Sequence, residues 1–127
     1  MKIELSGKVA SGRGEGRKYV ELPWVQEQMS EKLGFNPYPG TLNLILDEEN
    51  TESRKLLEKN AALKVCPAIG YCTGLLFKAS VAGLECGVVV PQVDNYPENL
   101  LEVVASVNLR QKLGVTDGDE VKLTVYL

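Results

Sequence analysis

The chain contains no histidine, and this absence excludes several kinds of enzyme mechanism. Neither a Ser-His-Asp nor a Cys-His nucleophile can be built, and no phosphohistidine carrier is possible. The spacing of Cys66, Cys72 and Cys86 contains no CxxC pair, and without histidine these residues do not form a typical zinc site. At least one of them stays unpaired in a monomer, so we expect buried free thiols in a reducing cytosol.

Long apolar runs are absent as well. No run approaches the ~18 residues of a membrane-spanning helix, and the N-terminal MKIELSGKV alternates like a strand instead of resembling a secretory signal. The 127 residues are 44% hydrophobic and 24% charged, as in an ordinary soluble domain that is large enough to bury a core. We therefore expect a single domain over residues 1–127 that is cytoplasmic and monomeric, with no membrane partner.

Basic side chains are slightly outnumbered by acidic ones overall, 14 to 17, but not at the N-terminus. The net charge of −3 disfavours a general nucleic-acid binder. Residues 1–18 nevertheless hold five basic side chains against two acidic ones, which leaves a balance of −6 for the rest of the chain. A local positive field of this kind suits a small anionic ligand better than a long polyanion.

The segment Pro37–Leu46, PYPGTLNLIL, is the most informative part of the sequence. Alternation along a strand sends Thr41 and Asn43 to one face and the intervening leucines to the other. A hydroxyl and an amide carbonyl side by side form half of a site for a hard cation such as Mg²⁺, whose shell substrate phosphates usually complete. The alternative is a Pro-Gly turn that enters an ordinary half-buried strand.

A glycine-rich segment, Ser11–Arg17, reads SGRGEGR. Its glycines allow the backbone to approach a phosphate closely, and its arginines supply donors that suit phosphate oxygens. The segment matches neither GxxxxGK[ST] nor the dinucleotide-binding fingerprint. A glycine-rich hairpin loop explains it equally well when it is taken alone.

Periodicity predicts many short strands and a few short helices. The predicted strands are residues 2–9, 17–22, 41–46, 100–105 and 121–127, with two or three more in 62–90, where Gly70, Gly74, Gly83 and Gly87 mark the breaks. The predicted helices are residues 23–33, 51–59 with Thr51 as a cap, and 108–113 with Ser106 as a cap. This pattern is typical of a mainly β protein, a closed barrel with helices packed outside.

Three motifs in order, SGxGEGR, GFxPYxGTLNL and LRxxLGxxDGDxV, resemble those of the archaeal CTP-dependent riboflavin kinase family. They stand at Ser11–Arg17, Gly34–Leu44 and Leu109–Val121 and extend over nearly the whole chain. The resemblance implies a closed six-stranded β-barrel of the cradle-loop type with two or three short peripheral helices. It also implies Mg²⁺-assisted transfer of the γ-phosphate of CTP to the 5′-hydroxyl of riboflavin, which gives FMN and CDP.

The resemblance also implies roles for particular residues. Thr41 and Asn43 would hold the metal. Glu102, the only charge in the run Leu100–Val104, would bind the flavin and orient or deprotonate the attacking hydroxyl. The family commonly has Thr, and His two residues on, where this chain has Asp94 and Tyr96, so Asp94 is placed on the flavin side. The residues expected to bind the nucleotide are Gly12, Arg13, Gly14, Glu15, Gly16, Arg17, Val107, Asn108, Leu109 and Arg110.

Alternatives remain at each level. Glu102 could face solvent on a strand, and Arg110 could be an ordinary charge on a helix face. The whole chain could be a barrel that binds flavin or nucleotide without turnover. It could also be a DNA-binding regulator of the swapped-hairpin type, whose barrels share the late LRxxLGxxDGDxV element, although the acidic balance disfavours this.

Overall fold

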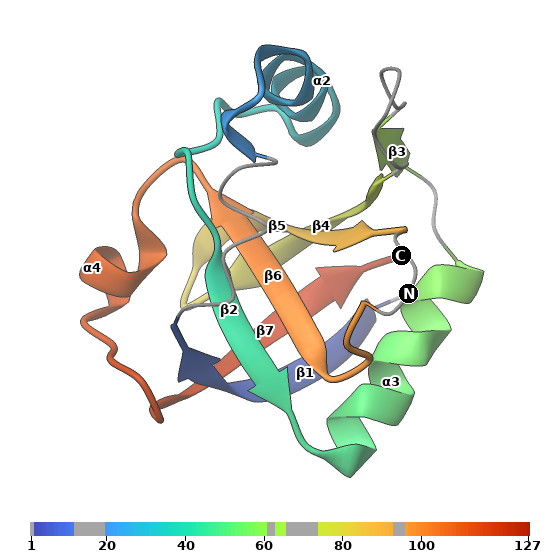
Figure 1. Cartoon of the computed structure of the whole chain (residues 1–127), viewed down its shortest axis with the longest axis vertical. Helices are drawn as coiled ribbons and strands as arrows, with labels where there is room; N and C mark the ends of the chain where they lie inside the picture. The colour runs from blue at the N-terminus through green and yellow to red at the C-terminus, as the bar shows by residue number, and fades with distance from the viewer. Residues whose placement is uncertain (1, 12–19, 61–62, 66–73, 93–95) are drawn as a thin grey trace.

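The computed structural model describes residues 2–11, 20–60, 63–65, 74–92 and 96–127 (Figure 1). Six antiparallel strands close into a barrel in the order β4-β5-β6-β2-β1-β7, and pairing between β4 and β7 completes the ring. A further strand, β3, pairs with β4 outside this ring. The strands are β1 (Lys2–Ala10), β2 (Leu42–Leu46), β3 (Leu63–Val65), β4 (Gly74–Val81), β5 (Leu84–Pro91), β6 (Leu100–Ala105) and β7 (Glu120–Tyr126). The predicted closed six-stranded barrel is confirmed.

The barrel interior follows from the alternation of apolar residues. Leu42, Leu44 and Leu46 of β2 all belong to the main core cluster, whereas Asn43 between them does not. Gly7 on β1 lies opposite this leucine row, and a Cβ there would stand 2.9 Å from Leu44 Cβ. The glycine therefore permits the close approach of β1 to β2.

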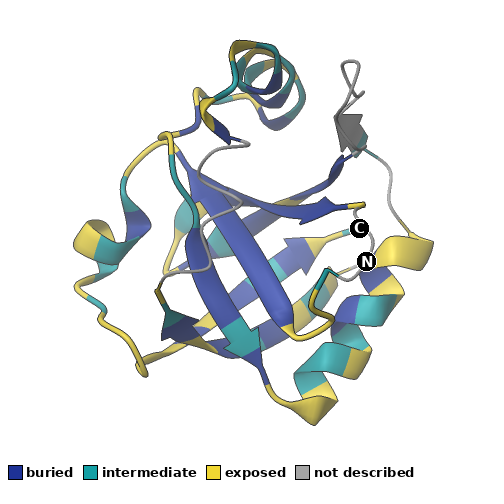
Figure 2. Ribbon diagram, in the orientation of Figure 1, coloured by how far each residue is buried: buried dark blue, intermediate teal, exposed yellow. Residues whose placement is uncertain are grey.

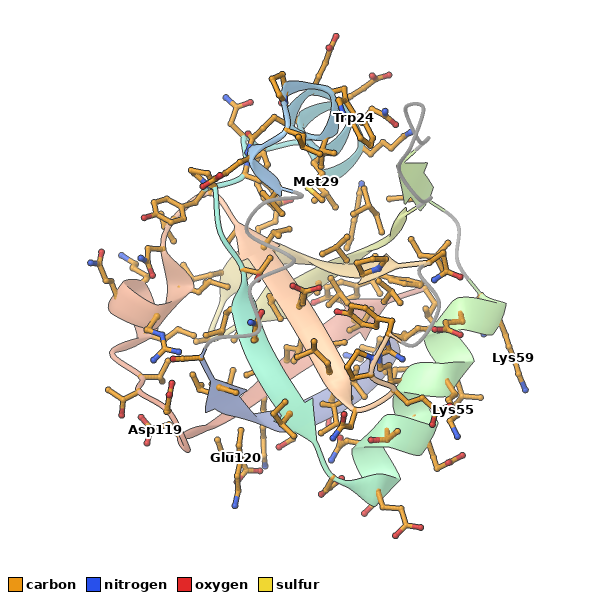
Figure 3. The ribbon with its side chains drawn as sticks, in the orientation of Figure 1. Trp24, Met29, Lys55, Lys59, Asp119 and Glu120 are labelled. Carbon is orange, nitrogen blue, oxygen red and sulfur yellow. The ribbon has the colours of Figure 1, made fainter. Side chains whose placement is uncertain are left out.

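Three helices, α2 (Pro23–Leu33), α3 (Glu48–Lys59) and α4 (Leu109–Leu113), lie outside the barrel (Figure 1). Helix α2 begins with proline and ends at Gly34 with a φ of 83°, as predicted. Its buried Val25, Met29 and Leu33 pack on outward-facing strand residues such as Val104, and Figure 3 shows Met29 pointing from the helix toward the barrel. None of the described helices has the length and apolar character needed to cross a bilayer.

The predicted strand at residues 17–22 is wrong at its C-terminal end. Residues 17–19 lie outside the described part of the chain, so the comparison concerns only the residues from Val20 onward. Val20 and Glu21 are helical, and the Val20 side chain is fully buried in the cluster beneath α2. Gln26 Nε2 donates to the Val20 carbonyl at 2.6 Å. Packing against α2 therefore draws this segment into helical backbone despite its strand-like sequence.

The start of α3 is also corrected. The helix begins at Glu48 with Asp47 as its cap, not at Thr51, because Asp47 Oδ1 accepts a hydrogen bond from the Asn50 backbone N–H at 2.8 Å. Helix α4 is likewise capped by Asn108 and not by Ser106, since Asn108 Oδ1 accepts from the Gln111 N–H at 3.2 Å.

Two of the predicted glycine breaks differ from the structure. Gly83 makes the turn between β4 and β5 with a φ of 78°, but Gly74 begins a strand and Gly87 lies inside one. A Cβ at Gly87 would stand 2.8 Å from Leu33 Cδ1, so this glycine lets α2 approach the barrel. Gly70 lies outside the described residues.

Cys86 is a buried free thiol, as predicted. Burial, and to a smaller extent the charge of Glu85, raises the pKa of this thiol to about 12, so it stays protonated at neutral pH. Cys66 and Cys72 lie outside the described residues.

Candidate active site

Three polar side chains meet on the outer face of β2 and β6. The two strands pair so that Asn43 stands directly opposite Glu102, which places both side chains on the same face. Thr41, one residue before β2, donates from Oγ1 to Asn43 Oδ1 at 2.8 Å, and the same Oγ1 lies 3.3 Å from Glu102 Oε1. The structure thus brings together the two predicted metal ligands and the predicted catalytic carboxyl.

Figure 2 shows β6 buried along its length, and Glu102 on this strand is 1% exposed. The alternative in which Glu102 faces solvent is therefore wrong. Both of its oxygens have hydroxyl partners. Oε1 faces Thr41, and Oε2 accepts a hydrogen bond from the Tyr96 phenol at 2.5 Å. A buried carboxyl group requires partners of this kind, because losing water without replacement hydrogen bonds is costly.

The Tyr96 phenol is a fixed donor to Glu102. Burial raises the pKa of Tyr96 well above its usual value, and the neighbouring Glu102 charge and hydrogen bond raise it further. The positive charge of Arg54 acts in the opposite direction and is the smallest of these effects. The phenol therefore keeps its proton at neutral pH and donates it toward Oε2.

A cavity of about 410 Å³ opens beside the oxygen cluster. Thr41 and Asn43 lie in its wall together with the predicted nucleotide-binding residues of the β6–α4 segment. Its lining is Ala10, Ser11, Tyr38, Pro39, Gly40, Thr41, Leu42, Asn43, Val103, Ala105, Val107, Asn108, Leu109 and Arg110. Three segments that are far apart in the sequence, residues 10–11, 38–43 and 103–110, therefore share one cavity. Its size suits a small-molecule ligand.

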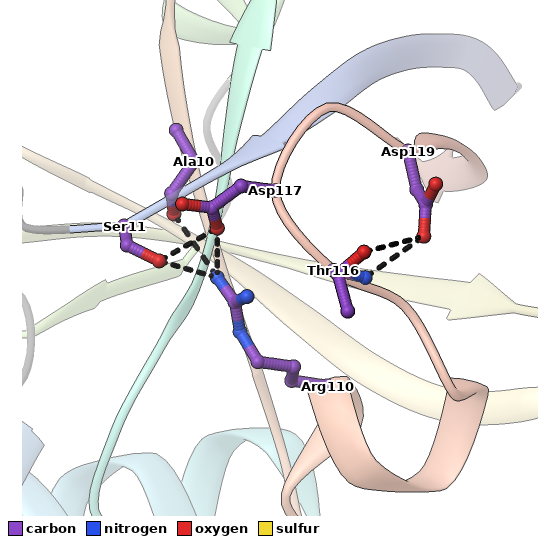
Figure 4. A network of polar contacts seen from close by, with 6 residues as sticks. All are labelled: Ala10, Ser11, Arg110, Thr116, Asp117 and Asp119. Carbon is purple, nitrogen blue, oxygen red and sulfur yellow. Dashed lines mark hydrogen bonds and ion pairs between the residues drawn. The ribbon is translucent and has the colours of Figure 1, made fainter.

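Arg110 lines this cavity and is part of a polar network, which Figure 4 shows. Its Nη2 donates to Ser11 Oγ at 2.9 Å and lies 2.9 Å from Asp117 Oδ1, and Ser11 Oγ also donates to Asp117 at 2.6 Å. The Ser11 hydrogen bond, followed by that of Arg110, lowers the pKa of the Asp117 carboxyl. Arg110 is therefore not an isolated charge on a helix face, because it links α4 to the end of β1.

Several predicted site residues lie outside the described part of the chain. These are Gly12, Arg13, Gly14, Glu15, Gly16 and Arg17 of the glycine-rich segment, and Asp94. Their neighbours are described. Ser11 lines the cavity, and Tyr96 contacts Glu102. The roles of the undescribed residues stay predictions.

The oxygen cluster fits a Mg²⁺ ion in its donor chemistry. A hydroxyl, an amide carbonyl and a carboxyl group are all hard oxygen ligands, which Mg²⁺ prefers. Among the described residues, no group of three His, Cys, Asp or Glu side chains could hold a metal by itself. Thr41 and Asn43 would thus supply only part of the shell and leave the rest to phosphate or water.

Two residues at or beside the site escaped the sequence analysis. Tyr38 stands in the cavity wall with 43% of its surface exposed. Arg54 of α3 is only 3% exposed, and its guanidinium carbon lies 5.6 Å from the centroid of the Tyr96 ring. The one available signal for Arg54 was its position three residues before Leu57, on the buried face of the helix.

Comparison with known proteins gives a consistent result. The family model of the CTP-dependent riboflavin kinase domain, described as "Domain of unknown function DUF120", matches residues 9–125. The riboflavin kinase of Ignicoccus hospitalis is 43% identical over 128 residues, which cover 98% of this chain and 72% of that protein. The riboflavin kinase of Archaeoglobus fulgidus is 41% identical, and the match covers 98% of this chain but only 55% of that protein. The riboflavin kinase of Pyrobaculum islandicum is 36% identical, and the match covers all of this chain but only 62% of that protein.

Proposed function

The chain belongs to the CTP-dependent riboflavin kinase family, and from this premise we propose that it transfers the γ-phosphate of CTP to the 5′-hydroxyl of riboflavin. The products are FMN and CDP, and Mg²⁺ assists the reaction. One observation carries the proposal. The oxygen cluster of Thr41, Asn43 and Glu102 adjoins a cavity that is lined by Val107–Arg110.

The donor side of the reaction is assigned to the cavity. Val107–Arg110 contact the nucleotide near its base and sugar, and the glycine-rich segment Gly12–Arg17 receives the phosphates. Thr41 and Asn43 would hold Mg²⁺, and the ion would supply charge neutralisation for the transferred phosphoryl group. Positioning and charge neutralisation account for most of the catalysis in phosphoryl transfer, so a site without histidine is sufficient.

The acceptor side is assigned to Glu102, with Asp94 on the flavin side. The riboflavin hydroxyl approaches the carboxylate, and its proton passes to a Glu102 oxygen as the hydroxyl oxygen bonds to the γ-phosphorus. The bond between that phosphorus and the bridging oxygen breaks, and CDP leaves with the electron pair. Glu102 suits this role because it lies in water-poor surroundings beside the predicted metal ligands.

The first experiment mixes the purified chain with riboflavin, Mg²⁺ and either CTP or ATP and separates the flavins by chromatography. We expect FMN and CDP in equal amounts with CTP, little product with ATP, and none when a chelator removes the metal. Riboflavin binding without FMN formation would favour the non-catalytic barrel. Equal rates with ATP and CTP would reject the proposed specificity for CTP.

We also propose a monomer without a nucleic-acid partner. The DNA-binding alternative is not pursued, because the chain belongs to the kinase family and carries a net charge of −3. Analytical ultracentrifugation with and without duplex DNA tests both statements.

A further inference from the structure

Arg54 is a buried cation beside the candidate site that the proposed reaction does not use. Its side chain is 3% exposed, and its ion pair with Glu58, at 3.6 Å, involves an acid that is 43% exposed. Its Nε has no hydrogen-bond partner among the described residues. The neighbouring Lys55, which is labelled in Figure 3, is 43% exposed. It forms ion pairs with Glu52 and Glu98.

Stability alone does not account for this burial. A guanidinium with one long ion pair and an unpartnered nitrogen gains little, and apolar residues of similar volume often replace buried ion pairs at no cost. The contact that does distinguish Arg54 is the Tyr96 ring, 5.6 Å from its guanidinium carbon. A cation over an aromatic face is attracted by the ring, and the attraction is stronger away from water.

Tyr96 connects this cation to the candidate catalytic group. Its ring faces Arg54, and its hydroxyl donates to Glu102 Oε2. Because Oε2 is held by the phenol, Oε1 is the oxygen that remains on the Thr41 side. A continuous series of contacts thus runs from α3 through one aromatic ring to the carboxyl group on β6.

We propose that Arg54 and Tyr96 are positioning residues for Glu102. The Tyr96 hydroxyl holds Oε2 so that Oε1 is presented to the acceptor hydroxyl, and Arg54 holds the Tyr96 ring in the orientation that makes this possible. The inference rests on the proposed function, since it concerns the acceptor side of the same site.

The test compares Tyr96→Phe, Arg54→Met and the double variant in riboflavin phosphorylation. We expect each single change to lower kcat about tenfold, the worth of a typical hydrogen bond, while the KM for CTP stays unchanged. The double variant should be no slower than Tyr96→Phe, because both changes break the same series of contacts. Arg54→Lys should recover part of the rate because a lysine keeps the charge over the ring.

Lys55→Met is the matched control. The Lys55 cation lies on the same helix and contacts the segment before β6 through Glu98, at 3.6 Å. The cation over the Tyr96 ring is Arg54, so this change leaves that contact in place. Its kcat should equal that of the wild type. A wild-type kcat for Arg54→Met, or losses that multiply to about a hundredfold in the double variant, would overturn the proposal.

A measurement without turnover separates this proposal from the proposed function. The side-chain carboxyl ¹³C resonance of Glu102 is assigned by its loss in Glu102→Gln. Its chemical shift should differ between wild type and Arg54→Met. It should be the same in Tyr96→Phe and in the double variant. If wild-type protein forms no FMN, the proposed function is rejected. If Arg54→Met leaves the resonance unmoved, the positioning role is rejected whatever the activity.

Discussion

Replacing Glu102 by glutamine should remove activity while leaving the fold in place, because the site can accommodate the amide. The amide oxygen can accept the Tyr96 hydrogen bond that Oε2 now accepts at 2.5 Å. The amide N–H can then donate to Thr41 Oγ1, now 3.3 Å from Oε1, since that hydroxyl uses its own hydrogen toward Asn43. Both of these hydrogen bonds stay satisfied, and the extra strength of a charged acceptor is lost from them. We expect a stability loss of ~1 kcal/mol.

The effect on turnover should be much larger. An amide is a very poor base, and general-base assistance is worth typically ~10²–10⁴-fold, which corresponds to ~3–5 kcal/mol of the barrier. The assay measures kcat and KM for riboflavin, CTP affinity by calorimetry and unfolding by denaturant. Glu85→Gln, the same change at an exposed position of β5, is the control and should change neither turnover nor stability.

Three results are informative for Glu102→Gln. A large loss of kcat with unchanged CTP affinity is the expected one. A raised KM for riboflavin with unchanged kcat would mean that Glu102 binds the flavin equally in the ground and transition states. Normal turnover would refute the reasoning and remove Glu102 from the chemistry.

Other changes test separate parts of the structure. Asn43→Leu offers no oxygen to a metal, so FMN formation should vanish while circular dichroism stays native; activity near the wild-type rate would rule out the metal assignment. Gly7→Ala should destabilise the barrel by ~1–3 kcal/mol in denaturant titration, because the new Cβ would meet Leu44 Cβ at 2.9 Å, and an unchanged midpoint would contradict this. Asp117→Asn should be less stable than wild type at about pH 7 but equally stable at about pH 2. The lowered pKa of Asp117 means that its carboxylate stabilises the folded state above the ordinary carboxyl pKa, and that this stabilisation is lost in acid, so the two proteins should converge at about pH 2.

The sequence predicted those parts of the fold that depend on local periodicity. The alternation of Leu42, Leu44 and Leu46 located β2 and its core face, and the four-residue spacing of Val25, Met29 and Leu33 located α2. The errors arose where tertiary packing decides the outcome. Val20 has strand-like neighbours but becomes helical because it packs with α2.

Cap choice was ambiguous for a different reason. Asp47, Asn50 and Thr51 can all cap a helix, and they stand within five residues of one another. Asp47 is the cap in the structure, and the helix then begins with Glu48 and Glu49, whose charges favour the N-terminus of a helix. Local sequence does not rank these candidates, because the position of the preceding strand fixes where the chain can turn.

The candidate site was only partly predictable for similar reasons. Strand alternation was enough to place Thr41 beside Asn43, and an isolated charge in an apolar strand marked Glu102. The pairing of Asn43 with Glu102 depends on the register between β2 and β6, which lie 59 residues apart at this pair. Arg54 and Tyr96 depend on how a helix and a loop pack against that sheet, and no periodicity records such packing.

The two sides of the site are held by different kinds of structure, and this difference should separate their functional effects. On the proposed acceptor side, Glu102 is fixed by strand pairing and by Tyr96, so a change there should alter the orientation of one oxygen. On the proposed donor side, Arg110 is tied to Ser11 and Asp117 by exposed polar contacts that a bound nucleotide can replace. Buried contacts of the first kind are rigid and should govern kcat, whereas exposed contacts of the second kind exchange readily and should govern nucleotide affinity. A variant of Asp117 that alters CTP affinity without altering kcat, beside a variant of Tyr96 that does the reverse, would establish this division.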